Sequence, residues 1–263
     1  MAATRSTKSA TSASIAKSAE RGARAGRTTR VPAAPRAPRA GGTGSAADFI
    51  PPRPTLPKLR AASKGCRGCN LWRVGTQTVF GEGPPAADVM FVGEQPGDKE
   101  DLAGRPFVGP SGRLLDAALE AAGIARDRVY VTNAVKHFKW TRGEKTARRI
   151  HKTPNSGEIT ACHPWLEAEI ALVKPRVIVC LGATSARALL GKAFRVSTQR
   201  GKVQRSETVG SVIATVHPSS VLRVPDAEAR EKAEKEFFAD VRKVGRELRR
   251  SGKPGPGTGD RGR

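Results

Sequence analysis

The sequence predicts an α/β fold, a three-layer αβα sandwich around a central, mostly parallel four-stranded sheet. Two observations lead to this prediction. First, short apolar runs rich in β-branched residues alternate with segments of helical periodicity. Second, the runs are continuously apolar, which is typical of parallel strands that are covered on both faces. The runs are residues 88–92, 128–132, 176–181 and 211–216.

Helical patterns fill the intervals between the runs. Asn155 and Glu158 have the spacing of a capping box, with Asn in place of the usual Ser or Thr. The patterns begin near Ser111, Asn155, Ala183 and Asp226.

The chain carries a formal net charge of +23 over 263 residues. Residues 1–60 hold +10 of this charge and residues 249–263 hold +4, which leaves about +9 on the part between them. Clustered Lys and Arg gain free energy by releasing counterions from phosphates, so an anionic polymer is the natural partner. A charge that only keeps the chain soluble is the alternative.

Three regions are expected along the chain. Residues 1–57 are rich in Ala, Ser, Thr, Arg and Pro and hold few large apolar side chains, which predicts a disordered basic arm. Residues 249–263 predict a disordered basic tail, and residues 58–248 predict one domain. No apolar run is long enough to span a membrane and residues 1–47 lack the core of a secretory signal, so we expect a cytoplasmic protein.

Polar and conformationally special residues follow each apolar run directly. In a parallel sheet the carboxyl ends of the strands meet at one edge, where ligand sites form. We therefore predict a cleft at this edge, although each segment alone could be an ordinary turn. The segments are Gly93-Glu94-Gln95-Pro96-Gly97, Asn133, Gly182-Ala183 and His217-Pro218-Ser219-Ser220.

Two side chains near this edge are candidates for contacting a base. Phe107 lies in a glycine-rich loop that leads into a helix, where it could serve as a stacking surface; a phenylalanine tucked into the core is the alternative. Asn133 can accept and donate hydrogen bonds side by side, as reading a base edge requires. An asparagine that merely caps its strand is the alternative for Asn133.

Cys66 and Cys69 form a C-x₂-C knuckle, which is a strong indicator of a zinc or iron-sulfur site. In a reducing compartment disulfides are not expected. Cys162 and His137 are the candidates for two further ligands, whereas Cys180 lies inside an apolar run and is expected to be a core residue. On chemistry alone a Cys₃His set could hold zinc equally well.

Several motifs together carry a family resemblance. With them, the chain from about Cys66 to Leu248 resembles the iron-sulfur uracil-DNA glycosylases of family 4, and within them most closely the UdgX subclass. Ordinary family 4 members have Gly where Gln95 stands and Cys where His137 stands. The motifs are Cys66-x₂-Cys69, Gly93-Glu94-Gln95-Pro96-Gly97, Gly104-Arg105-Pro106-Phe107-Val108-Gly109, Thr132-Asn133-Ala134-Val135-Lys136-His137 and His217-Pro218-Ser219-Ser220-Val221-Leu222-Arg223.

The resemblance implies removal of uracil from DNA, with single strands favoured, by a protein that holds a [4Fe-4S] cluster. It also leads us to expect a monomeric, nucleoid-associated bacterial protein. The residues implied are Gly93, Gln95, Phe107, Asn133 and His217 for uracil; Glu94, Gln95, His151 and His217 for catalysis; Ser111, Gly112, Arg148, Arg149, Lys152, Ser219, Ser220 and Arg223 for DNA; and Cys66, Cys69, His137 and Cys162 for the cluster.

His151 lies in an extra loop, residues 142–154. Neighbouring cations are expected to keep its imidazole neutral, and a neutral imidazole is a nucleophile. In the UdgX pattern the loop reads Lys-Arg-Arg-Ile-His, and the resemblance implies that the histidine attacks the sugar once uracil has left, giving a covalent adduct. Ala147 stands where the pattern has its first Lys, and Arg149 is expected to steady the loop.

Three alternatives stay open at this stage. Water positioned by Gln95 or Glu94 could replace the histidine, which would give an ordinary turnover enzyme that releases abasic DNA. His151 could contact phosphates only. The chain could also be a non-catalytic, basic nucleic-acid-compacting protein, for which the residues 1–57 arm would be the functional part.

Overall fold

The structure is a computed structural model that describes residues 44–144, 147–206 and 210–251. All of these residues belong to one compact unit, Pro38–Arg263. Most of the predicted arm and nearly all of the predicted tail, residues 1–43 and 252–263, lie outside the described residues. None of the described helices is both long enough and apolar enough to cross a membrane.

The central sheet has the order β2-β1-β5-β7-β6. The four predicted apolar runs form its four parallel strands, so the predicted α/β fold class is confirmed. A fifth strand, β6, pairs antiparallel with β7 at the edge and was not predicted, because it is short, polar and only half-buried. The strands are β1 (Val89–Gly93), β2 (Val129–Asn133), β5 (Val177–Leu181), β6 (Val203–Ser206) and β7 (Gly210–Thr215).

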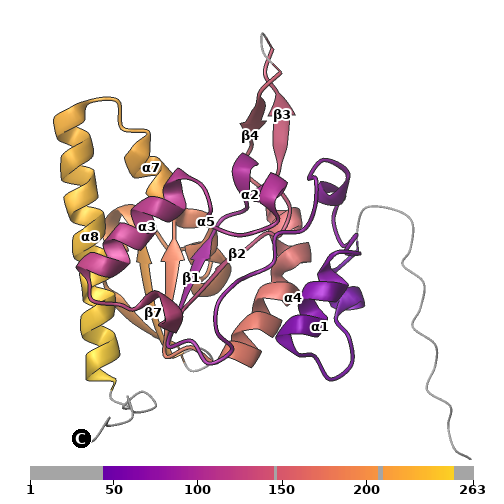
Figure 1. The fold of residues 1–263 in the computed structure, drawn as a ribbon, viewed down its shortest axis with the longest axis horizontal. Helices are drawn as coiled ribbons and strands as arrows, with labels where there is room; N and C mark the ends of the chain where they lie inside the picture. The colour runs from indigo at the N-terminus through magenta and orange to yellow at the C-terminus, as the bar shows by residue number, and fades with distance from the viewer. Residues whose placement is uncertain (1–43, 145–146, 207–209, 252–263) are drawn as a thin grey trace, which may run out of the picture. The chain divides into compact units, whose positions relative to one another are not determined.

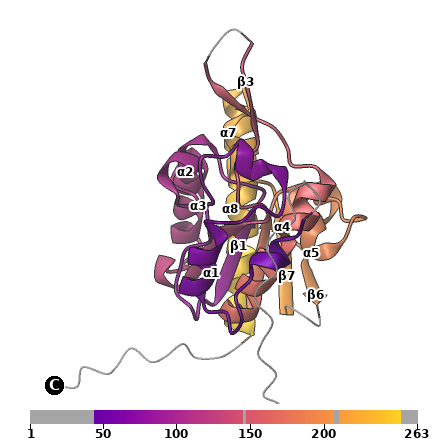
Figure 2. The same cartoon turned by 90° about the vertical axis from the view of Figure 1, so that its right-hand side faces the viewer.

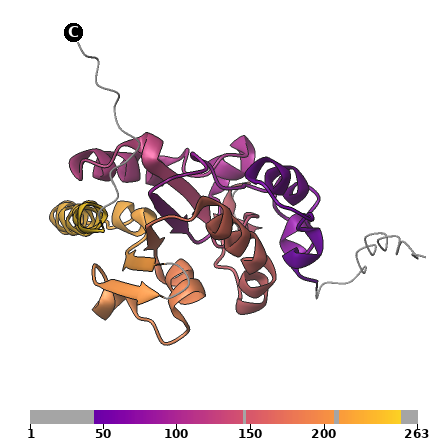
Figure 3. The same ribbon diagram turned by 90° about the horizontal axis from the view of Figure 1, so that it is seen from below.

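Helices cover both faces of the sheet, as the continuously apolar strands require (Figures 1 and 3). Along β1, Val89 and Phe91 pack into the core on one face, and Met90 and Val92 pack into the core on the other. The first face is covered by α3 (Pro110–Ala121), α7 (Pro218–Leu222) and α8 (Ala227–Arg250). The second is covered by α4 (Ser156–Val173) and α5 (Ala183–Leu190), with α1 (Leu56–Ser63) packed beyond α4.

Helices begin at or next to the four predicted starts, and two of these starts have a side-chain cap. Asn155 caps α4 with both halves of the capping box: the Glu158 N–H donates to Asn155 Oδ1 at 2.9 Å, and the Asn155 N–H donates to Glu158 Oε2 at 2.7 Å. Asp226 caps α8. The shorter helices are α2 (Asp98–Ala103), α6 (Val196–Gln199) and the 3₁₀ turns Ala46–Phe49, Asn70–Arg73 and Arg126–Arg128.

The predicted extra loop is a β-hairpin. Its strands β3 (Trp140–Arg142) and β4 (Arg149–His151) pair antiparallel, with Trp140 opposite His151. The hairpin projects from the body of the domain near α2 (Figures 1 and 2). This pairing makes the position of His151 depend on regular backbone hydrogen bonds rather than on a free loop.

The ordered part of the chain begins earlier than residue 58. The turn Ala46–Phe49 packs against α4, and a Cβ on Gly68 would lie 2.7 Å from the Ala46 backbone nitrogen. Ala46 is buried, and Phe49, Ile50 and Leu56 pack on the same cluster. These few apolar side chains are sufficient to order a segment whose composition alone predicts disorder. At the other end, α8 extends to Arg250.

A buried ion pair joins β2 to α4. Lys136 Nζ lies 2.5 Å from Glu169 Oε2 and also donates to Thr132 Oγ1 and to the Asn133 carbonyl oxygen. Glu169 Oε1 accepts from the Gly81 N–H and the Tyr130 hydroxyl. Both charges are fully buried but saturated with hydrogen bonds, which is the condition for tolerating charges in a core.

Replacing Lys136 by Met leaves the Glu169 carboxylate buried without its counter-charge. We expect the free energy of unfolding to fall by about 3–5 kcal/mol, measured by urea denaturation. In the double variant Lys136→Met/Glu169→Leu no charge is left unpaired, so we expect it to be more stable than the single variant. A single variant as stable as the wild type would show that the pair does not stabilise the fold.

Candidate active site

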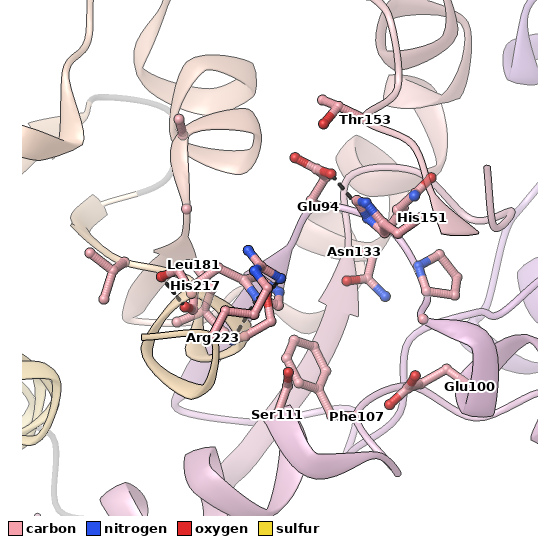
Figure 4. Close-up of a pocket in the computed structure, with 18 of the residues that line it drawn as sticks. Glu94, Glu100, Phe107, Ser111, Asn133, His151, Thr153, Leu181, His217 and Arg223 are labelled. Atoms are coloured by element: carbon pink, nitrogen blue, oxygen red, sulfur yellow. Dashed lines mark hydrogen bonds and ion pairs between the residues drawn. The ribbon is translucent and has the colours of Figure 1, made fainter. Parts of the chain in front are cut away.

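A pocket of about 670 Å³ opens at the carboxyl ends of β1, β2, β5 and β7, the edge that the sequence predicts. This volume is within the range of small-ligand sites. Figure 4 shows Asn133 and Phe107 facing a common space, with Glu94 and His151 on one side and His217 and Arg223 on the other. Residues that are distant in sequence therefore converge on one site.

Asn133 lines the pocket at the end of β2, and Gly93 lies beside it at the end of β1. They are paired across β1 and β2, and a Cβ at position 93 would lie 2.3 Å from Asn133 Oδ1 and 3.0 Å from Phe107 Cζ. The recess between amide and ring therefore depends on glycine. Asn133 is largely buried and lines the pocket, and no hydrogen bond to its carboxamide is found within the described residues. The carboxamide is accessible from the pocket, so a ligand there can supply its hydrogen bonds.

Phe107 reaches the pocket from a strained loop. Its φ of 56° lies in the left-handed region, which non-glycine residues rarely adopt and which is frequent at functional sites. Its ring lines the pocket and also packs against the core, and its role as a stacking surface for a base stays a prediction. Gly112 makes the loop possible, because a Cβ there would lie 1.6 Å from the Phe107 carbonyl oxygen.

His217 is neutral and has a defined tautomer. Its Nδ1 accepts a hydrogen bond from the Ser219 N–H at 3.1 Å, so the ring proton is on Nε2. Burial is the main cause that lowers the pKa of His217 to about 4; Glu94 opposes it, and Arg223 and His151 make smaller contributions in the same direction as burial. The ring stacks near Phe107, with centroids 6.3 Å apart. The site therefore offers an N–H donor without a charge.

Glu94 and His151 are in contact on the opposite side. Glu94 Oε1 lies 3.3 Å from His151 Nε2, and Glu94 Oε2 accepts a hydrogen bond from the Thr184 hydroxyl. Burial raises the pKa of Glu94, but hydrogen bonds from His151 and Thr184, with the two imidazoles nearby, lower it below its usual value. The sequence reasoning considered only the cations near His151, and the structure adds a carboxylate in direct contact with its ring.

Comparison with known proteins identifies the family. Residues 80–242 match the model of the uracil DNA glycosylase superfamily. The chain belongs to this superfamily. It is 36% identical over 72% of its length to the type-4 uracil-DNA glycosylase of Sulfurisphaera tokodaii, covering 84% of that relative. It is 39% identical to the type-4 uracil-DNA glycosylase of Pyrobaculum aerophilum, over 65% of this chain and 86% of that relative. It is also 39% identical to that of Thermotoga maritima, over 64% of this chain and 83% of that relative.

In this member of the uracil DNA glycosylase superfamily, Arg149 holds the hairpin to α2. Its guanidinium lies 2.5 Å from both Asp98 Oδ1 and Asp101 Oδ2, and it stacks over the rings of Phe138 and Trp140. The expectation that Arg149 steadies this segment agrees with these contacts. Its guanidinium is engaged by two carboxylates, and the expected contact with DNA stays a prediction.

Gln95 likewise holds the base of the hairpin. Its Oε1 accepts from the Lys139 N–H at 2.9 Å, and its Nε2 donates to the carbonyl oxygens of Lys139 and Lys152 at 3.2 and 3.0 Å. Both Nε2 protons are thus used by the backbone. These bonds position the segment that carries His151, and the expected role of Gln95 in positioning a water stays a prediction.

The residues expected to contact DNA are divided between two surfaces and the interior. Ser111, Ser219, Ser220 and Arg223 line the pocket, and Arg223 donates to Ser219 Oγ at 3.0 Å. Arg148 and Lys152 are exposed on the hairpin. Gly112 is buried and its N–H donates to the Gly109 carbonyl oxygen, so its expected DNA contact is corrected to a packing role.

Three of the four residues predicted to hold the iron-sulfur cluster lie together in one buried apolar part of the core. They are Cys66, Cys69 and Cys162. Trp165 Nε1–H donates to Cys66 Sγ at 3.3 Å, and the Lys136 backbone N–H donates to Cys162 Sγ at 3.3 Å. Burial raises the pKa of Cys162 to about 12 and lowers that of His137 to about 4. Within residues 44–251, excluding the gaps, no three His, Cys, Asp or Glu side chains are arranged to hold one metal ion.

The sequence reasoning missed Thr184 and Asp98 as parts of the site. Thr184 comes two residues after Gly182, the residue that follows β5, so the strand-end rule could have included it. Nothing in the pattern around Asp98 indicates that it pairs with Arg149. Cys180 lies in the core of β5, as the sequence predicts.

We expect the His217 imidazole to stay neutral down to about pH 4. In the unfolded chain a histidine titrates near ~6.5, so the folded-state pKa is depressed. As the pH falls below ~6.5, the unfolded state binds a proton at this group that the folded state does not bind. Titration of this histidine therefore lowers the free energy of unfolding as the pH falls from there to the folded-state pKa. Ring ¹⁵N chemical shifts measure the titration, with His217→Gln to assign the signal. Titration near ~6.5 in the folded protein would contradict the assignment.

Proposed function

We propose that this protein removes uracil from DNA and then captures the resulting sugar covalently through His151. The first step is supported by the Asn133 carboxamide, which lies beside Phe107 in the pocket without a hydrogen-bond partner among the described residues. It is also supported by membership of the uracil DNA glycosylase superfamily and by relatives that are named type-4 uracil-DNA glycosylases. The second step rests on the presence of His151 in the same pocket.

Base recognition follows from hydrogen-bond polarity. The Asn133 amide oxygen accepts from uracil N3–H, and its amide nitrogen donates to uracil O4. Cytosine presents the opposite pattern, so each mispaired buried group costs about 1–3 kcal/mol. The Phe107 ring stacks on the extruded pyrimidine. Nε2–H of neutral His217 donates to uracil O2, where negative charge develops as the glycosidic bond breaks.

The capture step breaks one bond at C1′ of the sugar and forms another. The bond between C1′ and uracil N1 breaks, and its electron pair leaves with the base, which takes a proton from solvent. The oxocarbenium-like C1′ accepts the lone pair of one His151 nitrogen, which forms a C–N bond. The proton on the other ring nitrogen passes to Glu94, which is in contact with that ring. Glu94 therefore acts as the base for the attacking imidazole.

The DNA strand is expected to cross the pocket mouth. Ser111, Ser219, Ser220 and Arg223 supply hydroxyl and guanidinium donors for phosphates there. Extruding a nucleotide costs a few kcal/mol and less when the base is unpaired, so single strands are the favoured substrate of a monomeric enzyme.

The capture is tested with uracil-containing single-stranded DNA on a denaturing gel. We expect a slowly migrating species that survives heat and detergent, together with release of one uracil per protein. His151→Ser should abolish this species while uracil release continues, because water then reaches C1′. Thr141→Ala, a control on the same hairpin at an exposed residue, should keep it. An adduct formed by His151→Ser excludes His151 as nucleophile, and uracil release without any wild-type adduct identifies a turnover enzyme.

We further propose that Cys66, Cys69, Cys162 and His137 hold a [4Fe-4S] cluster. Three observations support this set. The three cysteines are buried in the same part of the core, N–H groups point at two of the sulfurs, and His137 is neutral. A cluster is larger than a single ion, so its ligands stand farther apart than those of zinc. When bound, it supplies a cross-link between the knuckle, α4 and the segment after β2; no redox step is required.

The cluster is tested by iron content and colour after anaerobic purification. We expect a brown protein with about four irons per chain, as the proposed cluster requires. Cys162→Ala should lose the iron and unfold at a lower temperature, whereas Cys180→Ala, a matched change of another buried cysteine, should retain it. A colourless wild-type protein that contains zinc would overturn the assignment.

A further inference from the structure

Thr184 holds the carboxylate that contacts His151. It is the second residue of α5, just beyond the end of β5, and its hydroxyl donates to Glu94 Oε2. The other carboxylate oxygen, Oε1, lies 3.3 Å from His151 Nε2. The two oxygens of Glu94 are therefore engaged from opposite sides, one by a fixed helix and one by the hairpin.

The two partners of Glu94 differ in what the chemistry requires of them. His151 must change its bonding during attack, whereas the Thr184 hydroxyl takes no part in the reaction. No other hydrogen bond to the Glu94 side chain is present in the part of the chain that the structure describes. Thr184 is thus the single stationary donor that fixes the rotation of the carboxylate.

The hydroxyl also acts on the charge of Glu94. A hydrogen bond donated to the ionised form stabilises that form, which counteracts the burial of this carboxylate beneath the hairpin. His217 also faces Glu94 from the turn after β7, and no other ionisable group is among the main influences on it. Without the hydroxyl, Glu94 would be protonated at a higher pH and could no longer accept the His151 proton.

We propose that Thr184 is a positioning residue for the capture step, which orients Glu94 so that it can take the proton from His151. This inference rests on the proposed function. Thr184 contacts neither Asn133, Phe107 nor His217 by any hydrogen bond in the described ranges, so its effect should be confined to capture. Loss of the hydroxyl should leave uracil binding unchanged and divert the sugar from His151 to water.

The test compares Thr184→Val, which removes the hydroxyl at nearly constant volume, with Thr184→Ser, which keeps it. Single-turnover reactions with uracil-containing single-stranded DNA give the capture rate, the ratio of adduct to free abasic DNA, and their pH dependence. For Thr184→Val we expect about tenfold slower capture, more free abasic DNA, and an acid limb moved up by about one pH unit. Thr184→Ser should restore wild-type values of all three.

Each outcome has a definite meaning. Equal values for wild type and Thr184→Val overturn the positioning role, and equal impairment of the Val and Ser variants shows that packing, not the hydroxyl, is responsible. Should Thr184→Val fail to fold, Thr184→Ala provides a second variant without the hydroxyl. A wild-type protein that releases uracil but forms no adduct overturns the proposed capture itself, which is distinguishable because no variant is needed to see it.

Discussion

The parallel register of the central sheet is the constraint on which the site depends. It pairs Gly93 with Asn133 at the ends of β1 and β2 and brings the turns after β5 and β7 to the same edge. Each strand end places a different group there: Gly93 leaves space, Asn133 provides an amide, Thr184 a hydroxyl and His217 an imidazole. A slip of one residue would exchange the side chains that pack on the two faces and would separate these groups.

Charges near the site are neutralised in pairs, and each pair also fixes a segment. Lys136 and Glu169 hold the chain after β2 against α4, and Arg149 joins the hairpin to Asp98 and Asp101 of α2. Glu94 contacts His151. A nucleophile must be held close to its reacting geometry to be effective. The paired charges and the Gln95 hydrogen bonds supply that precision to a hairpin that otherwise projects from the domain.

The local rules succeeded where the signal itself is local. Apolar runs predicted the four parallel strands, and the Asn155 capping box predicted the start of α4, because burial on both faces and a three-residue spacing are written directly in the chain. The edge strand β6 and the two strands of the hairpin were not predicted, since they are short, polar and at least partly exposed. The order of residues 44–57 also escaped, because it depends on packing against a distant helix.

For the site, the sequence by itself determined which chemical groups are present: the amide, the aromatic ring, the imidazoles, the carboxylate and the cysteines all stand in short motifs. Only the tertiary structure decided what each group touches. Gln95 and Arg149 bond the hairpin, and His151 lies against the carboxylate of Glu94. The physical reason is that hydrogen bonds and ion pairs join residues tens of positions apart, and their partners are fixed only when the layers pack.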